Sequence, residues 1–134
     1  KRLFGMEAED IALLRVAKSS GNFTIIRQHG EWFLDSAPDQ SINQQELNLF
    51  VSRVADLPAE RTIQLTRKNL DEFGLSPPEI TIIGVDTKGR QRGYLALGKL
   101  GEGLVYTIGT GLPGVYQSRS LILSQVPTPK FFQQ

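Results

Sequence analysis

Short apolar segments separated by turn-forming residues dominate this chain and limit the folds that it can adopt. The segments are rich in β-branched and aromatic residues, and glycine, proline, asparagine or aspartate stands between them. This pattern predicts a series of β-strands joined by tight turns. The segment 61–66 also fits an extended crossing, and 121–126 is ambiguous between helix and strand. We expect strands at 11–16, 23–28, 31–35, 61–66, 80–85, 94–97, 104–108 and 115–116.

One stretch departs from the strand pattern and predicts the principal helix, over about 43–56. Its apolar residues recur at helical spacing, which places them on one stripe that can pack on a sheet. Asn43 with Glu46 fits a capping box at the start of the helix, and Ser41 with Gln44 is an alternative start. Pro58 ends the helix. The apolar stripe is Leu47, Phe50, Val51, Val54 and Leu57.

Two residues outside this helix are expected to shape the core and its connections. Trp32 alternates with Leu34 on a predicted strand, which favours a core position over a platform for a ligand. The segment 68–73 predicts one helical turn, and Gly74 stands where a left-handed C-cap is expected. Pro77 and the proline that follows it prevent the helix from resuming.

The predicted elements indicate an α+β fold with antiparallel β-meander sheets and one amphipathic helix packed on a sheet. A chain of 134 residues and 14.9 kDa corresponds to one domain. Apolar residues are similarly spaced at the start of two segments, which suggests two related β-β-β-α-like halves. We expect a lead segment at 1–8, the domain at 9–126, its halves at 11–57 and 80–126, and a C-terminal tail at 127–134.

Composition excludes several classes of site. The chain has no cysteine and one histidine, so a disulfide framework, a thiolate nucleophile, a zinc site with cysteine ligands and any site with two imidazoles are ruled out. A net charge of +1 produces no strong field toward nucleic acid or an anionic membrane. No run of 18 apolar residues is present to span a bilayer. We therefore expect no cofactor, no bound metal and no nucleic-acid partner.

The sequence at 109–114, Gly-Thr-Gly-Leu-Pro-Gly, matches the dinucleotide-binding pattern G-x-G-x-x-G. In such a site, the glycines open a helix whose N-terminus binds the pyrophosphate. Here Pro113 and the surrounding turn residues argue against a helix, and no acidic residue after Glu102 is present to hold a ribose. We interpret the motif as a loop that connects two strands.

His29 is the sole imidazole that could act as a general base. Ser19, Ser20 and Asp35 are close to it in the sequence, so a hydrolase triad is conceivable. The sequence around His29 predicts a hairpin turn, however, where an imidazole is solvated. We therefore assign no catalytic residue and expect His29→Ala to leave the fold and the biological activity intact.

Adjacent carboxylates occur as Glu9-Asp10 and Asp71-Glu72. Neighbouring residues do not face one another on a helix or a strand, which disfavours acid–base catalysis by either pair. Acidic residues in the first turn of a helix are favoured by the helix dipole, and this is the interpretation that we adopt. One histidine and scattered carboxylates also lack the spacing of a zinc site.

Lys88, Arg90 and Arg92 are spaced two apart around a predicted hairpin turn at 86–89. Alternate residues of a strand share a face, so Arg90 and Arg92 predict a small basic patch. A solvated hairpin edge protected by charge is one interpretation. Contact with a partner or with a phosphate is the other, and these three residues are the candidates for partner binding.

Several elements of the sequence resemble a bacterial family of unknown function. The most specific is Phe73-Gly74-Leu75-Ser76-Pro77-Pro78, and the likeness runs over about 9–126. This family occurs in auxiliary proteins of gliding-motility-type ABC transporters and in short single-domain membrane-anchored proteins. The other matching elements are 9–11, 30–34, 55–57, 59–61, 97–98 and 115–116.

The resemblance implies a domain that follows an N-terminal transmembrane segment and faces outside the cytoplasm. The chain begins at Lys1 and not at methionine, so we expect a cut N-terminus, either from processing of an anchor or a signal peptide or by design. The family has no established catalytic residues, and the shared positions suit turns and packing. These positions are Trp32, Gly74, Leu75, Pro78 and Gly98.

The sequence therefore predicts a non-catalytic interaction or scaffold module of a membrane-anchored protein, auxiliary to a transporter and bound to protein partners in a membrane complex. The alternative is a ligand-binding domain for a glycan, a lipid or a peptide. A flat face with exposed apolar residues would favour the first function. A concave apolar pocket with a few convergent polar groups would favour the second.

Overall fold

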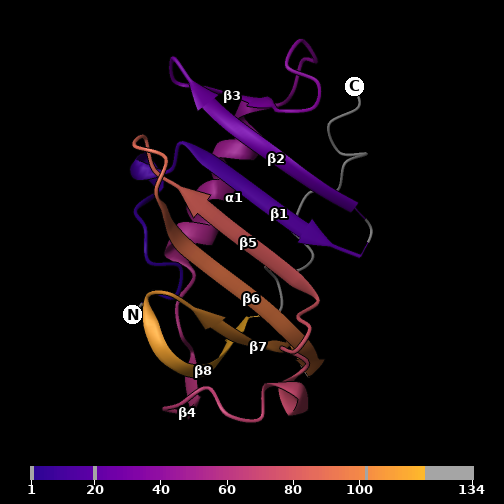
Figure 1. The fold of residues 1–134 in the computed structure, drawn as a ribbon, viewed down its shortest axis with the longest axis vertical. Coiled ribbons are helices and arrows are strands. Elements are labelled where there is room, and N and C mark those ends of the chain that lie inside the picture. Colours follow the sequence, from indigo (N-terminus) through magenta and orange to yellow (C-terminus); the bar gives the residue numbers. More distant parts are fainter. Residues whose placement is uncertain (1, 20, 102, 120–134) are drawn as a thin grey trace.

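The computed structural model describes residues 2–19, 21–101 and 103–119, and in this part of the chain the strands form one eight-stranded sheet (Figure 1). Every pair of neighbouring strands is antiparallel. The strands are β1 (Leu13–Lys18), β2 (Gly21–Gln28), β3 (Glu31–Leu34), β4 (Arg61–Gln64), β5 (Ile80–Val85), β6 (Gln91–Gly101), β7 (Leu104–Gly109) and β8 (Leu112–Arg119). Their order across the sheet is β3-β2-β1-β5-β6-β7-β8-β4. The α+β class is confirmed, with one continuous sheet where we expected separate meander sheets.

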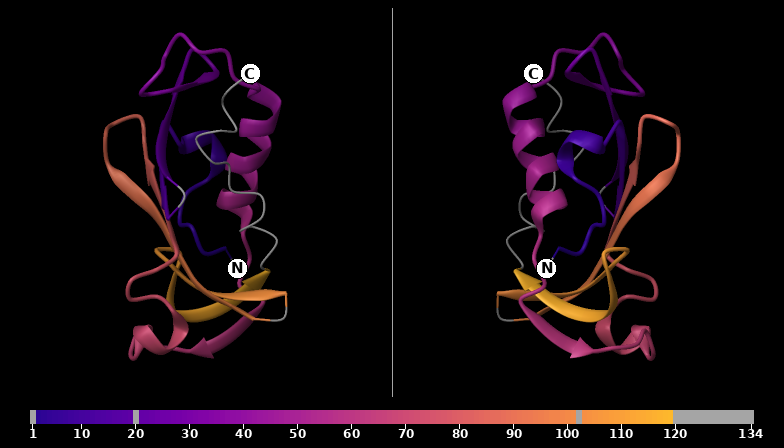
Figure 2. Two further views of the ribbon diagram at one scale, coloured as in Figure 1. Left: turned by 90° about the vertical axis from the view of Figure 1, so that its right-hand side faces the viewer. Right: turned by 90° about the vertical axis from the view of Figure 1, so that its left-hand side faces the viewer.

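The principal helix, α1 (Gln44–Asp56), lies along one face of this sheet (Figure 2). The Asn43 side chain caps its first turn by accepting a hydrogen bond from the Glu46 N–H at 3.0 Å, so the start at Asn43 is the one that forms. The first four of the five residues in the predicted stripe are buried with at most 2% of their surface exposed. The predicted helix on a sheet is therefore confirmed.

Two meanders meet at the centre of the sheet. Strands β1 to β3 form the first and β5 to β8 continue the second, with β1 pairing β5. Strand β4 follows α1 in the sequence but pairs with β8 at the far edge. The segment 80–119 therefore contributes four strands, and the expected α-like element at 121–126 and the tail at 127–134 lie outside the described residues.

The segment before residue 9, which we expected to be a lead outside the domain, contributes to the main core. It runs between α1 and the sheet and ends in the short 3-10 helix η1 (Ala8–Asp10). The Leu3 N–H donates to the Leu57 carbonyl at 3.1 Å, which joins this segment to the end of α1. The core begins before the predicted boundary at residue 9, because the buried side chains include Leu3, Phe4 and Met6.

A second, smaller core lies on the opposite face of the sheet. On β6, Leu95 and Leu97 belong to the main core, whereas Ala96 between them belongs to the second one. The 3-10 helix η2 (Leu70–Phe73) covers this part of the face, and the Phe73 ring packs 4.9 Å from that of Tyr106. Helix η2 ends at Gly74 with φ of 69°, which confirms the predicted left-handed C-cap.

Trp32 on edge strand β3 is a core residue, as predicted, with 1% of its surface exposed. Its indole N–H donates to the Asn48 side chain of α1 at 2.9 Å. The Gln44 side-chain amide accepts from the Trp32 backbone N–H at 2.7 Å and donates to its carbonyl. The first turns of α1 therefore satisfy backbone groups that an edge strand would otherwise leave free.

Candidate functional site

The β5–β6 hairpin carries the basic residues that the sequence singled out. Its turn closes as predicted, because the Gly89 N–H donates to the Asp86 carbonyl at 3.0 Å and the Asp86 N–H to the Arg90 carbonyl at 2.9 Å. Gly89 has φ of 77°, a conformation that glycine adopts without strain. The turn therefore places Lys88 and Arg90 at an exposed end of the hairpin.

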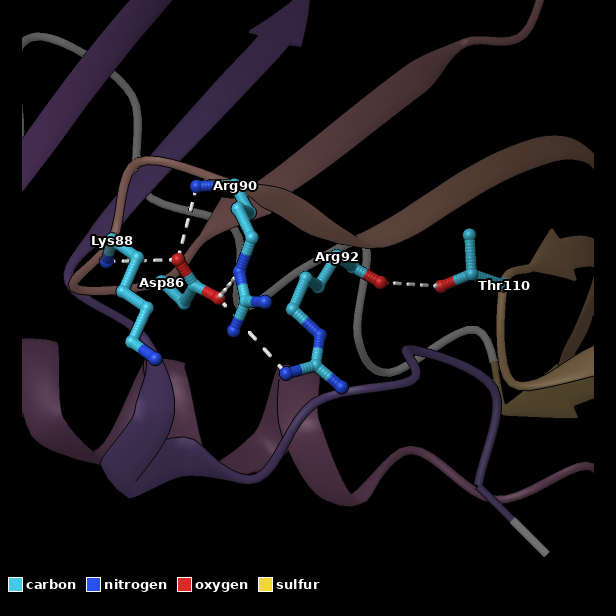
Figure 3. Close-up of polar contacts among 5 residues, drawn as sticks. All are labelled: Asp86, Lys88, Arg90, Arg92 and Thr110. Atoms are coloured by element: carbon cyan, nitrogen blue, oxygen red, sulfur yellow. Dashed lines mark hydrogen bonds and ion pairs between the residues drawn. The ribbon is translucent and has the colours of Figure 1, made fainter.

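The Asp86 carboxylate organises this end of the hairpin (Figure 3). Only 8% of its side chain is exposed, and its Oδ1 accepts the backbone N–H groups of Lys88 and Arg90, both at 2.9 Å. Its Oδ2 accepts from the Arg90 Nε at 2.9 Å and lies 3.9 Å from an Arg92 guanidinium nitrogen. The Arg90 backbone hydrogen bond is the largest cause that lowers the Asp86 pKa, against an opposing effect of desolvation.

A β-bulge brings the two arginines to the same carboxylate. Gly84 pairs with Gly93 and Val85 pairs with Gln91, which leaves Arg92 as the extra residue. The predicted basic patch of Arg90 and Arg92 therefore forms. All three basic residues are exposed, as a solvated end of the hairpin requires. They do not protect an edge of the sheet, because β5 and β6 are central strands.

A second candidate site is the outer face, which we define as the face of β3, β2, β1 and β5 opposite to α1. Four apolar side chains form a row across these strands, joined by direct cross-strand pairing. Each is half-buried, and none belongs to either described core cluster. The solvated face of an antiparallel sheet usually carries polar side chains, so this apolar row departs from that pattern. The outer row is Phe33, Ile26, Leu13 and Val85.

Charged and polar residues flank the outer row. Arg15 is exposed, pairs in register with Thr24 and Ile83, and forms no ion pair within the described residues. The patterns considered in the sequence did not predict this face. Each of its four strands contains two adjacent apolar residues. Successive side chains of a strand point to opposite faces of the sheet, so one residue of each pair must lie on the outer face. These pairs are Leu13-Leu14, Ile25-Ile26, Phe33-Leu34 and Ile82-Ile83.

An open groove of about 770 Å³ lies where the β1–β2 connection approaches the start of β5. Its walls are short polar side chains, two prolines and the oppositely charged Lys18 and Glu79. Such a volume is in the range of small-molecule sites, although those are mostly apolar and enclosed. The lining residues are Ala17, Lys18, Ser19, Asn22, Pro77, Pro78, Glu79, Ile80 and Thr81.

The structure does not bring the described residues of the conceivable triad together. His29 and Gly30 form the two-residue β2–β3 turn, both with positive φ, and His29 is exposed. Ser19 precedes β2 and His29 follows it, so roughly 25 Å of strand separates them. Ser20 lies outside the described residues. Asp35 is exposed at the end of β3.

The glycine motif at 109–114 spans the end of β7, the turn at 110–111 and the start of β8, so it contains the strand connection that we predicted. Its glycines permit close contact between backbones: a Cβ on Gly111 would overlap the Arg2 carbonyl, and one on Gly114 would overlap that of Gln64. Thr110 within the turn approaches the Phe4 carbonyl at 2.6 Å and the Arg92 carbonyl at 3.1 Å. Gly111 therefore allows the N-terminal segment to pack closely, and Gly114 allows the same for β4.

The paired carboxylates occupy the two 3-10 helices. Glu9 and Asp10 lie in η1, Asp71 and Glu72 lie in η2, and all four are exposed. Among the described residues, no group of three or more histidine, aspartate or glutamate side chains is placed to hold a metal ion. Neither pair therefore joins the candidate sites above.

Scans against protein-family models, curated proteins and solved structures found no match to this chain. Within the described residues, no helix combines the length and the apolar character that crossing a membrane requires.

Proposed function

We propose that this domain is a non-catalytic interaction module that binds a protein partner through its outer face. The observation that supports the proposal is the outer row, four half-buried apolar side chains in direct cross-strand register with no described element packed on them. The free energy falls when a partner covers apolar surface of this kind and removes it from water, which favours binding. A row of apolar side chains across a sheet face suits a protein surface better than a small ligand, which binds in a concave pocket.

The charges on the outer face indicate the chemistry of that partner. Arg15 lies at the centre of the face, between Thr24 and Ile83, and its guanidinium has no carboxylate partner among the described residues. A complementary surface would place an apolar patch over the outer row and a carboxylate opposite Arg15. The proposed partner is therefore a different protein with an apolar surface that contains an acidic residue.

Site-specific photo-crosslinking in the native cell tests this proposal. A photoreactive phenylalanine analogue replaces Phe33 on the outer face of the full-length protein, and in a matched protein it replaces Leu49, which is 43% exposed on α1. We expect one discrete heterologous crosslink from position 33 and none from position 49. The double substitution Leu13→Thr and Ile26→Thr should abolish the crosslink while thermal unfolding shows a folded protein, since threonine keeps a high strand propensity.

Three results would contradict the proposal. One is an absence of crosslinks from position 33, and another is a crosslink that survives the double substitution. The third is a crosslink to a second copy of the chain, which would make the outer face a homodimer interface. Sedimentation of the purified domain distinguishes this last result from binding to a different protein.

The resemblance described above supports a cellular setting for this module. We propose that the full-length protein is anchored in a membrane, that this domain lies outside the cytoplasm, and that the protein is auxiliary to a transporter complex. The two related halves are also part of this proposal, with β1 to β3 and β5 to β7 as their strands. Accessibility of a cysteine at exposed position 49 to a membrane-impermeant reagent tests the location, and labelling only after lysis would contradict it.

Ligand binding is the second candidate function, and the groove beside Pro77 and Pro78 supports it. Hydroxyl, amide and charged groups from Ser19, Asn22 and Glu79 line the groove, and these groups suit a glycan or a short peptide. Titration with chito-oligosaccharides, followed by NMR, would show saturable shifts at Asn22 if this function holds. Shifts that do not saturate would exclude this ligand class from the groove.

A further inference from the structure

We infer that the end of the β5–β6 hairpin binds a phosphate group of a small phosphorylated ligand. This site is separate from the outer face and does not depend on the function proposed above. Lys88, Arg90 and Arg92 lie at this end of the hairpin with the single carboxylate of Asp86, which pairs with the two arginines, so the cluster carries two net positive charges. A phosphate monoester carries close to two negative charges at neutral pH, which matches that excess.

The arginine donors are already oriented for an anion. Both guanidinium groups face the same Asp86 oxygen, Oδ2: the Arg90 Nε donates to it at 2.9 Å, and one terminal nitrogen of Arg92 forms an ion pair with it at 3.9 Å. The two terminal nitrogens of Arg90 and the second one of Arg92 have no partner among the described residues. Each arginine side chain is 58% exposed, so these donors remain accessible to a ligand. Planar guanidinium donors of this kind suit paired hydrogen bonds to phosphate oxygens.

The backbone supports the arrangement from both sides. The bulge at Arg92 and the Thr110 side chain, 3.1 Å from the Arg92 carbonyl, fix the backbone of Arg92. The Asp86 carboxylate holds Arg90 by accepting hydrogen bonds from both the backbone N–H and the Nε of that arginine. Figure 3 shows the Lys88 ammonium and both guanidinium groups pointing to the same side of the hairpin. Fixed donors lose less conformational entropy when a ligand binds, which favours affinity.

Titration of the purified domain with inorganic phosphate, followed by the Nε–H signals of its arginines in NMR spectra, tests the inference. We expect saturable shifts at Arg90 and Arg92 and none at Arg15, the exposed arginine of the outer face. Arg92→Gln should weaken phosphate binding about tenfold, because it removes charge-assisted hydrogen bonds, whereas Arg15→Gln should leave the affinity unchanged. Acetate at matched ionic strength should shift these signals without saturation.

Three outcomes would overturn the inference. These are an absence of saturable shifts at Arg90 and Arg92, an unchanged affinity in a folded Arg92→Gln protein, and equal saturable binding of acetate. The last outcome would assign the cluster to carboxylate groups, such as those of an acidic protein. Thermal unfolding of each variant confirms that the hairpin remains folded, and both arginines are exposed enough to be replaced without loss of core packing.

Discussion

At the scale of the residue, Asp86 shows how one buried carboxylate determines the conformation of a turn. It accepts two backbone N–H groups and the side chain of Arg90, and these bonds lower its pKa in the folded state. A carboxylate with a lowered folded-state pKa stabilises the protein fully above its unfolded-state pKa, which is near 3.9. That contribution is lost as the pH falls below this value and through the folded-state pKa.

The Asp86→Asn protein should therefore show a weaker dependence of stability on pH than the parent. We expect its midpoint of thermal unfolding to lie below that of the parent at pH 7, and the gap to narrow as the pH is lowered below about 4. Thermal unfolding followed by circular dichroism between pH 7 and pH 2 measures this gap. Asp39→Asn, at an exposed position with no ion pair in the described residues, is the control. If the difference between the unfolding midpoints of the parent and Asp86→Asn stayed constant with pH, ionised Asp86 would not be the stabilising group.

At the scale of the element, α1 combines a local signal with contacts that only the fold supplies. Its stripe and its Asn43 cap are local, whereas the Gln44 and Asn48 side chains reach across to Trp32 on β3. Arg27 extends the same arrangement, since it lies 5.0 Å from the Trp32 ring and donates to the Glu9 carbonyl at 2.8 Å. The helix, the edge strand and η1 are thereby joined around one tryptophan.

Truncation of the helix stripe should be costly. Phe50 is 2% exposed in the main core, so Phe50→Ala should reduce the free energy of unfolding by about 3–5 kcal/mol. Leu49→Ala on the exposed side of the same helix is the matched control, with an expected change of about 0.5 kcal/mol or less. Urea denaturation measures both. Equal losses in the two variants would show that α1 does not pack on the sheet by this stripe.

At the scale of the whole molecule, the N-terminal segment joins the two parts of the sheet. Phe4 packs where Gly84 and Gly93 face each other on β5 and β6, and a Cβ on Gly93 would lie 2.5 Å from its ring. The backbone of the same segment bonds to the β7–β8 turn, since the Gly111 N–H donates to the Leu3 carbonyl at 2.8 Å. The first residues of the chain are therefore part of the core.

Removal of the Phe4 ring tests this role. Phe4 is fully buried, so Phe4→Ala should reduce the free energy of unfolding by about 3–5 kcal/mol. Arg2→Ala removes exposed ion pairs with Glu7 and Asp56 and should leave the free energy of unfolding close to that of the parent, because water screens such pairs. Urea denaturation compares the two proteins. Unchanged stability of the Phe4→Ala protein would show that the N-terminal segment does not contribute to the core.

The sequence alone determined the features that depend on neighbours along the chain. The helix stripe at 47–54, the C-cap at Gly74, the turn at 86–89 and the inward position of Trp32 each follow from local periodicity or backbone geometry. Each expected strand from 11–16 to 115–116 also has a counterpart in the sheet, although β6 and β8 extend further than predicted.

Tertiary structure alone decided the features that join distant residues. The burial of Phe4 needs Gly84 and Gly93, about eighty residues away in the sequence. The outer row exists because register aligns one apolar residue from each of four strands, and the strands' own sequences do not encode that register locally. The convergence of Arg90 and Arg92 on Asp86 needs a bulge that pairing with β5 defines. Local patterns specify which segments are strands, whereas strand order, register and bulges arise from packing between segments, and the candidate sites depend on these.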